Sequence, residues 1–197
     1  KRVLDSLNED IPVIDMKLSE VEQEILYDLH LLTNKKRLFV LNCKEGLNMG
    51  VVNEWKIELE KRTGDIVKVV DVKLIQDMAD LDENEKREYL ELLDGTPTVA
   101  EDIVMGAYDT LNLITFYTGS EKECNAWSIE KGANAKEAAG AIHTDLMNGF
   151  VSAEVVNVDT LLDCGGWNGA KEKGLIKSVG KEYIVEDGEY MVVLANK

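Results

Sequence analysis

The 197-residue sequence has none of the long apolar runs that mark membrane proteins. A membrane-spanning helix needs about 20 apolar residues, and no stretch approaches that length. The first ten residues, KRVLDSLNED, contain no secretory signal. Proline is also scarce, with two residues, and 45% of the residues are apolar, which excludes collagen-like and disordered sequences. We therefore expect a globular, cytoplasmic protein with no membrane partner.

Cysteine is rare and has no pattern. Cys43, Cys124 and Cys164 lie far apart, and the sequence contains no Cys-x-x-Cys pair. This distribution supports neither a disulfide framework nor a zinc site. We expect reduced, packed thiols.

Basic residues are too few to balance the acidic ones, and the formal net charge is −16. A surface this acidic repels phosphate backbones, so broad nonspecific binding to DNA or RNA is not expected. A partner that contains RNA would have to be contacted through a local patch or through protein.

The sequence also lacks a GxxxxGK[ST] motif. That motif supplies the backbone cradle and the lysine that hold nucleotide phosphates. We therefore expect neither a nucleotide nor magnesium to be bound to this chain alone.

The first third of the sequence predicts a short helical segment followed by a strand–helix–strand unit. Ser19 and Glu22 have the spacing of a capping box. The residues after this cap, up to position 32, carry an apolar stripe at helical spacing, made of Val21, Ile25, Leu29 and Leu32. This pattern predicts an amphipathic helix over residues 20–32.

The apolar run Leu38–Leu41 is too short for a helix and indicates a buried strand of a parallel sheet. Residues 49–61 are typical of a helix that stops at Gly64, and residues 66–72 predict the next buried strand. Ligands of open α/β sheets bind at the carboxyl ends of such strands. The polar residues after Leu41 are therefore candidate site residues.

Two further helices are predicted before the second half of the chain. Residues 77–93 are charged and helical in pattern, and residues 98–111 follow a third capping box formed by Thr98 and Glu101. We place a domain boundary near Asn112.

Residues 113–150 predict a strand, a turn, a second strand and a helix. Leu113–Tyr117 and Cys124–Ile129 have strand patterns, and Asn134 with Glu137 forms another capping box before a small-residue helix that runs to Leu146. Two strands crossed by one helix begin a β-grasp domain. The remainder predicts a strand at 151–158, helical turns at 159–164 and 170–174, and a hairpin of 181–185 with 190–195.

The sequence of this region strongly resembles the TGS domain at the C-terminus of YchF-type proteins. The resemblance rests on TFYTGSEKE followed by AW, EAAG, IH and GF. YchF-type proteins are a branch of the Obg-related P-loop NTPases. The stretch LLTNKKRLFVLNCKEG resembles their base-recognition loop, in which NxxE replaces the usual NKxD. The resemblance covers essentially the whole chain.

The resemblance implies three parts. Residues 1–34 would end a helical insertion, residues 35–111 would form the C-terminal part of a nucleotide-binding α/β domain, and residues 112–197 would form a TGS domain. The expected fold class is therefore α/β, a partial P-loop NTPase-like parallel sheet with a helical tail, plus an α+β β-grasp domain.

The NxxE loop corresponds here to Asn42-Cys43-Lys44-Glu45. The amide of Asn42 can donate to and accept from a purine edge, the Cys43 position can pack against the ring, and Glu45 can accept from an exocyclic amine. The alternative interpretation is an ordinary polar turn at the end of a strand.

A second base-contacting loop would follow the next strand, where the family carries Ser or Cys and then Ala. This chain has Asp71-Val72-Lys73 there. Val72 and Lys73 are expected beside the base, but Asp71 adds charge and Val72 adds bulk. Base recognition in this chain therefore departs from the family pattern.

Five other side chains bear on function. His143 and Asp145 are two residues apart and are not expected to form a metal pair or a catalytic dyad; His143 is expected to be a packed or interface residue. Trp127 and Phe150 are expected in the core. Asn125 stands where the family often has arginine, which removes one positive contact.

The resemblance implies a protein that binds and hydrolyses ATP or GTP with magnesium and acts with the ribosome or another translation component through its TGS domain. The alternative is a stand-alone module that binds protein or RNA and has no catalytic activity. A phosphate loop encoded upstream of Lys1 in the natural gene would distinguish these two interpretations.

We predict that the 197-residue chain hydrolyses neither ATP nor GTP. Phosphoryl transfer depends on a backbone cradle, a lysine and a held magnesium ion, and the sequence supplies no phosphate loop. Phosphate release by the purified chain with magnesium and each nucleotide measures this. Turnover that survives further purification and disappears in Asn42→Ala would contradict the prediction.

Overall fold

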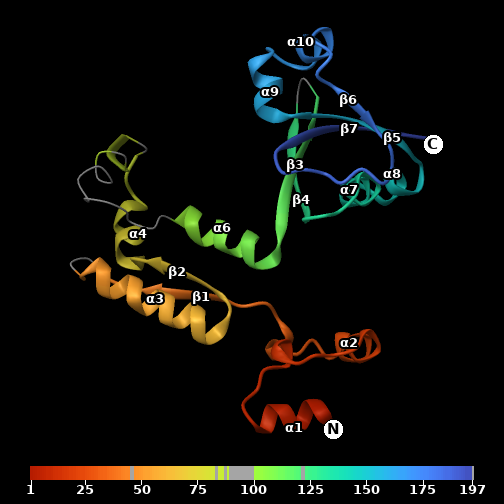
Figure 1. The fold of residues 1–197 in the computed structure, drawn as a ribbon. Coiled ribbons are helices and arrows are strands. Elements are labelled where there is room, and N and C mark those ends of the chain that lie inside the picture. The colour runs from red at the N-terminus through yellow and green to blue at the C-terminus, as the bar shows by residue number, and fades with distance from the viewer. Residues whose placement is uncertain (45–46, 83, 87, 89–99, 121–122, 197) are drawn as a thin grey trace. The chain divides into compact units, whose positions relative to one another are not determined.

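The computed structural model describes residues 1–44, 47–82, 84–86, 88, 100–120 and 123–196. The chain divides into two compact units, Lys1–Thr110 and Leu111–Lys197 (Figure 1). The first contains a parallel strand pair and the second a five-stranded mixed sheet, in agreement with the expected fold class. The finer division into three parts stays a prediction. No helix in the described ranges has both the length and the apolar character to cross a membrane.

The first unit begins with two short α-helices and two 3-10 turns: α1 (Arg2–Asn8), η1 (Val13–Asp15), α2 (Glu20–Tyr27) and η2 (Leu32–Asn34). The predicted capping box of α2 is present. The Ser19 hydroxyl accepts from the Glu22 backbone N–H at 3.3 Å, and the Glu22 carboxylate accepts from the Ser19 N–H at 2.9 Å.

The predicted extent of this helix was wrong. Helix α2 ends at Tyr27, and His30 has a left-handed backbone with φ of 46°, a conformation that ends regular helix. The predicted apolar stripe is exposed, whereas Leu26, outside that stripe, is buried. The spacing of apolar residues therefore did not identify the buried face of α2. That face contains Leu26, whereas the predicted stripe is exposed to solvent.

Arg37 forms ion pairs that connect the N-terminal segment to the sheet. Its guanidinium lies 3.0 Å from the Asp15 carboxylate and 2.8 Å from that of Asp65. Arg37 precedes the first strand and Asp65 precedes the second, so one cation joins three segments of the chain. Val13, next to this cluster in η1, is fully buried.

The predicted strand–helix–strand unit is confirmed as β1 (Leu38–Asn42), α3 (Met49–Thr63) and β2 (Ile66–Val70). The two strands pair in parallel, with Leu38 opposite Ile66 and Asn42 opposite Val70. Helix α3 begins where the Asn48 side chain accepts from the Gly50 N–H at 2.8 Å, and it stops at Gly64 with φ of 73°.

Strand β2 is two residues shorter than predicted, because Asp71 starts a helix. Its carboxylate accepts from the Leu74 N–H at 2.9 Å and caps α4 (Val72–Met78). A helix therefore begins before residue 77, the predicted start. The predicted continuous helix from 77 to 93 was wrong, because residues 79–82 interrupt it between the end of α4 and the helical residues 84–86 and 88; residues 83, 87 and 89–93 lie outside the described residues.

Helix α6 (Ala100–Leu111) agrees with the predicted helix 98–111, although Thr98 of the proposed cap lies outside the described residues. A Cβ on Gly106 would lie 2.7 Å from the side chain of Lys68, which extends from β2. Gly106 is therefore needed for the close approach of α6 to the sheet, and Lys68 and Asp109 lie 4.0 Å apart beside it.

The second unit has strand order β4-β3-β7-β5-β6. Its strands are β3 (Leu113–Gly119), β4 (Cys124–Glu130), β5 (Phe150–Asn157), β6 (Lys177–Val179) and β7 (Glu189–Ala195), and its helices are α7 (Ala135–Ile142), α8 (Thr144–Asn148), α9 (Val158–Asp163) and α10 (Trp167–Glu172). Strands β3 and β7 are parallel, and the other pairs are antiparallel. This is the expected β-grasp arrangement, although β6 was not predicted.

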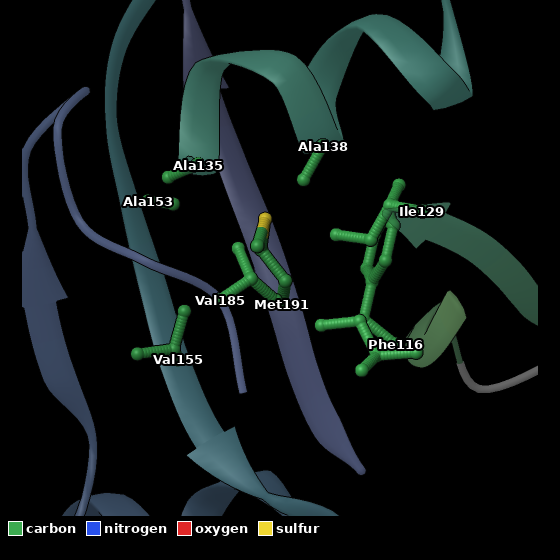
Figure 2. Packing of buried hydrophobic residues seen from close by; sticks show 9 residues of the cluster. Phe116, Ile129, Ala135, Ala138, Ala153, Val155, Val185 and Met191 are labelled. Atoms are coloured by element: carbon green, nitrogen blue, oxygen red, sulfur yellow. The ribbon is translucent and has the colours of Figure 1, made fainter. Parts of the chain in front are cut away.

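The core of the second unit lies between α7 and the sheet (Figure 2). Ala135 and Ala138 on α7 are fully buried, as are Phe116, Ala153 and Val155 on the strands. The alanines let the helix lie close to the strands, as the small-residue pattern predicted. The prediction that Trp127 and Phe150 belong to the core is confirmed, because both pack against this cluster.

The predicted last hairpin was wrong. Residues 181–185 form only an isolated bridge, and β7 lies between β3 and β5. The Val185 N–H donates to the Ala133 carbonyl at 3.1 Å, and the Ala135 N–H donates to the Tyr183 carbonyl at 2.8 Å. The segment is therefore bonded to the turn before α7 instead of to β7.

A buried carboxylate fixes the turn before β7. Glu189 is buried and accepts from the Tyr183 hydroxyl at 2.6 Å and from the Glu186 N–H at 3.0 Å. Burial, together with the bond to this carboxylate, raises the pKa of Tyr183. Tyr183 therefore remains a hydrogen-bond donor to Glu189 throughout the neutral pH range.

Two expectations about single side chains were wrong in part: His143 is not packed, while its expected role as an interface residue stays a prediction, and Cys124 is exposed. His143 ends α7 with an extended backbone, and its Nδ1 accepts from the Asp145 N–H at 3.1 Å, so it caps α8. The His143 side chain is 66% exposed and is not packed. Cys124 is exposed, unlike the buried Cys43, and therefore is not a packed thiol.

We predict that residues 112–197 fold without the rest of the chain. Every member of the buried cluster lies between Ile114 and Met191, so the fragment retains its whole core. Expression of the fragment should give a domain that melts cooperatively. An unfolded fragment would show that the boundary or the β-grasp assignment is wrong.

We also predict that the Asp71 cap stabilises the first unit. Asp71→Ala should lower the free energy of unfolding by about 1 kcal/mol, whereas Asp71→Ser should retain most of it. Hydrogen exchange of residues 38–78 measures the change. The control is Asp77→Ala, which breaks only an exposed ion pair with Lys73 and should cost less than about 0.5 kcal/mol. Equal losses in both alanine variants would contradict the prediction.

Candidate nucleotide-base site

The candidate site lies at the carboxyl ends of β1 and β2. Because the two strands are parallel and in register, with Asn42 opposite Val70, the loops that follow them begin at the same edge of the sheet. The Cys43 N–H donates to the Val70 carbonyl at 2.8 Å and extends the pairing by one bond. The predicted NxxE loop and the loop at Asp71 therefore start side by side.

Asn42 joins the two loops directly. Its side-chain oxygen accepts from the Val72 N–H at 3.3 Å, a contact between residues 30 apart in sequence. Since Oδ1 is engaged, the amide presents Nδ2 as its donor to a ligand. The residue is exposed, so that donor is at the surface of the edge.

The other predicted residues of the first loop are in different environments. Cys43 is only 8% exposed, which leaves little of its surface for a purine ring, and Lys44 is exposed. Glu45 lies outside the described residues, so its predicted contact with an exocyclic amine stays a prediction. The structure thus brings Asn42 to the edge and packs Cys43 beneath it.

The second loop contributes an aliphatic side chain near Asn42, and its two charged side chains each have a polar partner. Val72 is 49% exposed at the first position of α4, next to Asn42. The Asp71 carboxylate is occupied as the helix cap, and Lys73 lies 2.5 Å from Asp77 along the same helix. The predicted contact of Lys73 with a base would require this ion pair to open.

The arrangement is suited to a flat, partly polar ligand. An amide donor from Asn42 and an aliphatic surface from Val72 lie together on one edge, and this pair can bind a base edge and a ring face. Within the described part of the chain, no three His, Cys, Asp or Glu side chains form a group that could hold a metal ion.

Two features of this edge were not predicted from the sequence: the Asp71 cap and the bond from the Val72 N–H to the Asn42 side chain. The cap had a recognisable signal, since aspartate directly before an apolar segment is a preferred first residue of a helix. The Asn42 bond had no such signal, because it joins residues that only the strand pairing brings together.

Two open hollows lie elsewhere in the units. One, of about 520 Å³, lies on α2 and is lined by Glu20, Gln23, Glu24, Tyr27 and Asp28. The other, of about 470 Å³, follows β4 and is lined by residues 129–133 and Glu137. Carboxylates line both hollows, and the second also has a basic residue, Lys131. The first hollow is therefore unsuitable for phosphate groups.

Comparison with known proteins supports the same assignment for both units. Residues 113–196 match the YchF-GTPase_C family, described as a protein of unknown function (DUF933). The chain is 35% identical over 193 residues to the ribosome-binding ATPase YchF of Bacillus subtilis (strain 168), which covers 95% of this chain. It is 34% identical over 182 residues to the ribosome-binding ATPase YchF of Escherichia coli O157:H7, and this match covers 92% of this chain.

The chain spans about half the length of these curated relatives, 52% and 50% respectively. A solved structure, that of the Schizosaccharomyces pombe YchF GTPase, matches 98% of this chain and 52% of its own with a TM-score of 0.78 and 29% identity. From these matches in sequence and fold, the chain corresponds to the C-terminal portion of YchF proteins, and its residues 113–196 belong to the YchF-GTPase_C family.

Proposed function

We propose that this chain is the base-recognising and TGS portion of a protein that binds and hydrolyses ATP or GTP and works with the ribosome in the cytoplasm. In this proposal, the edge formed by Asn42 and Val72 holds the nucleotide base. The phosphates and magnesium are held by parts of the protein outside this chain, and the TGS domain contacts the ribosome or another translation component.

The observation that carries the proposal is the bond from the Val72 N–H to the Asn42 side chain. It connects the loops after two parallel strands and orients one amide donor at the edge where ligands of such sheets bind.

The proposed activity and partner follow the names of the relatives. Both curated relatives described above are named ribosome-binding ATPase YchF, and the solved structure is named a GTPase. The two names differ in the nucleotide. The preference for ATP or GTP should therefore be tested by substituting the base-recognising residues.

A second candidate function applies to the chain by itself. The second unit has a complete buried core, and residues such as Leu162 and Val151 are more than half exposed on its surface. These features favour a TGS module that binds a partner without catalysis. The two candidates are compatible, since an interaction module can serve the larger nucleotide-hydrolysing protein.

We predict that the intact protein binds ATP at least as well as GTP. The aspartate of an NKxD motif accepts from two guanine N–H groups, and Glu45, one methylene longer, cannot keep that position without moving its loop. Each lost charged hydrogen bond costs on the order of 1.5–3 kcal/mol. Titration of the full-length protein with both nucleotides measures the preference.

The matched control is Glu45→Asp, which should shift the preference of the intact protein toward GTP. Asn42→Ala should weaken the binding of both ATP and GTP, because it removes the amide that binds either purine. A preference of the unmodified protein for GTP above about tenfold, which corresponds to about 1.4 kcal/mol, would overturn the prediction.

A further inference from the structure

Arg37 lies between two carboxylates, at the end of the strand pair opposite to the candidate site. It directly precedes β1, and Asp65 directly precedes β2. Its Nη2 lies 2.8 Å from Asp65 Oδ2 and donates to Asp15 Oδ1 at 3.0 Å. The Arg37 and Asp65 side chains are only 27% and 19% exposed, whereas those of the Arg2–Glu22 ion pair are 59% and 36% exposed. The Arg37–Asp65 pair is therefore less screened by solvent.

Arg37 compensates a charge that is shielded from water. Asp65 Oδ2 is buried and accepts no aligned hydrogen bond from any described residue, so the guanidinium at 2.8 Å is the positive group beside it. Removing one partner of a shielded ion pair leaves the other charge uncompensated, which costs more than the loss of an exposed pair. Loss of Arg37 should therefore disturb the pairing of β1 with β2 where the two strands begin.

Strands β1 and β2 lie side by side (Figure 1), but the packing of β1 does not by itself fix their register. No residue of β1 is fully buried, and Val40 is 45% exposed. Register is weakly specified where a strand lacks a buried face, and a slip by one residue turns every side chain to the other face. Such a slip would take Asn42 away from the Val72 N–H. The site therefore needs another interaction that fixes the register.

The double contact of Arg37 distinguishes the observed register from its neighbours. Leu38 is opposite Ile66, so Arg37 falls opposite Asp65. A slip in one direction places Leu38 opposite Asp65, and a slip in the other places Lys36 there. In both cases Arg37 lies on the other face of the pair and has to give up one of its two carboxylates. A slip by two residues keeps the face but moves Arg37 along β2 by about 7 Å.

We propose that Arg37 is a positioning residue for the candidate nucleotide-base site. It fixes the register of β1 with β2 at one end of the strands, and this register brings Asn42 to Val72 at the other end. Arg37 acts through the strand pairing and does not contact the nucleotide. The inference rests on the proposed function for the ligand of the site, whereas the effect on the Asn42 bond can be measured without a nucleotide.

Hydrogen exchange of the 197-residue chain tests the effect on this bond. In Arg37→Met, the amides of Cys43 and Val72 should exchange about tenfold faster or more, because both donate across the ends of the strands. The Leu74 amide, which donates to the Asp71 cap of α4, should change much less. Arg37→Lys keeps the positive charge and should retain most of the protection.

A double variant shows whether Arg37 acts through Asn42. Asn42→Ala alone should also speed exchange of the Val72 amide, because it removes the acceptor. Adding Arg37→Met should cause no further change at Val72, since the bond is already lost. The matched control is Arg2→Met, which makes the same change in charge, breaks the more exposed ion pair with Glu22 and should leave the Val72 amide unchanged.

Titration of the intact protein with ATP and with GTP, each with magnesium, connects this effect to the proposed function. Under conditions where the variant is folded, Arg37→Met should raise both dissociation constants about tenfold and leave their ratio unchanged. Arg2→Met should leave both constants unchanged. A residue that only stabilises the fold would lower the melting temperature of the variant without changing either constant.

Equal acceleration at Leu74 and Val72 in Arg37→Met would overturn the proposal, because it would show a general loss of stability. Additive effects of Arg37→Met and Asn42→Ala on the Val72 amide would also overturn it. Weaker nucleotide binding in Asn42→Ala but not in Arg37→Met would show that the base site does not depend on Arg37. Unchanged binding in Asn42→Ala would instead overturn the base site itself, and the exchange rates would show separately whether Arg37 fixes the bond.

Discussion

The parallel pairing of β1 with β2 is the constraint on which the candidate site depends. Parallel strands end at the same edge, so the two loops that follow them start together although they are far apart in sequence. The Asn42 side chain then bonds the Val72 N–H and connects the loops. If the pairing shifted by one residue, Asn42 would point to the other face of the sheet and this bond would be lost.

Helix caps determine where the loops of this site end. Asn48 starts α3 and Asp71 starts α4, and in both cases a side-chain oxygen accepts from a backbone N–H of the first turn. The Asp71 cap also engages one oxygen of the carboxylate with the first turn of α4. The departure of this chain from the family at Asp71 therefore has a structural role in the helix, while Val72 is the residue that changes the surface near Asn42.

The second unit depends on the insertion of β7 between β3 and β5. The turn before β7 is bonded to β3, because the Thr115 N–H donates to the Asp187 carboxylate and the Gly188 N–H donates to the Thr115 carbonyl, both at 2.8 Å. The buried Glu189 holds the same turn from within. This central position of β7 leaves β4 and β6 as the outer strands of the five-stranded sheet.

The sequence by itself determined the local features. Capping boxes at Ser19 and Asn134, the strand at Leu38–Leu41, the stop at Gly64 and the small-residue face of α7 all rest on interactions within a few residues, and each is present. The predicted burial of that strand was wrong, since Leu38, Phe39 and Leu41 are half-buried and Val40 is exposed. It also identified Asn42 as a strand-end residue. The tertiary structure decided the partners: which face of α2 is covered, that 181–185 bonds to the turn before α7 instead of to β7, and that Asn42 meets Val72. These contacts join residues distant in sequence, and their free energy depends on strand order and packing, which no local pattern encodes.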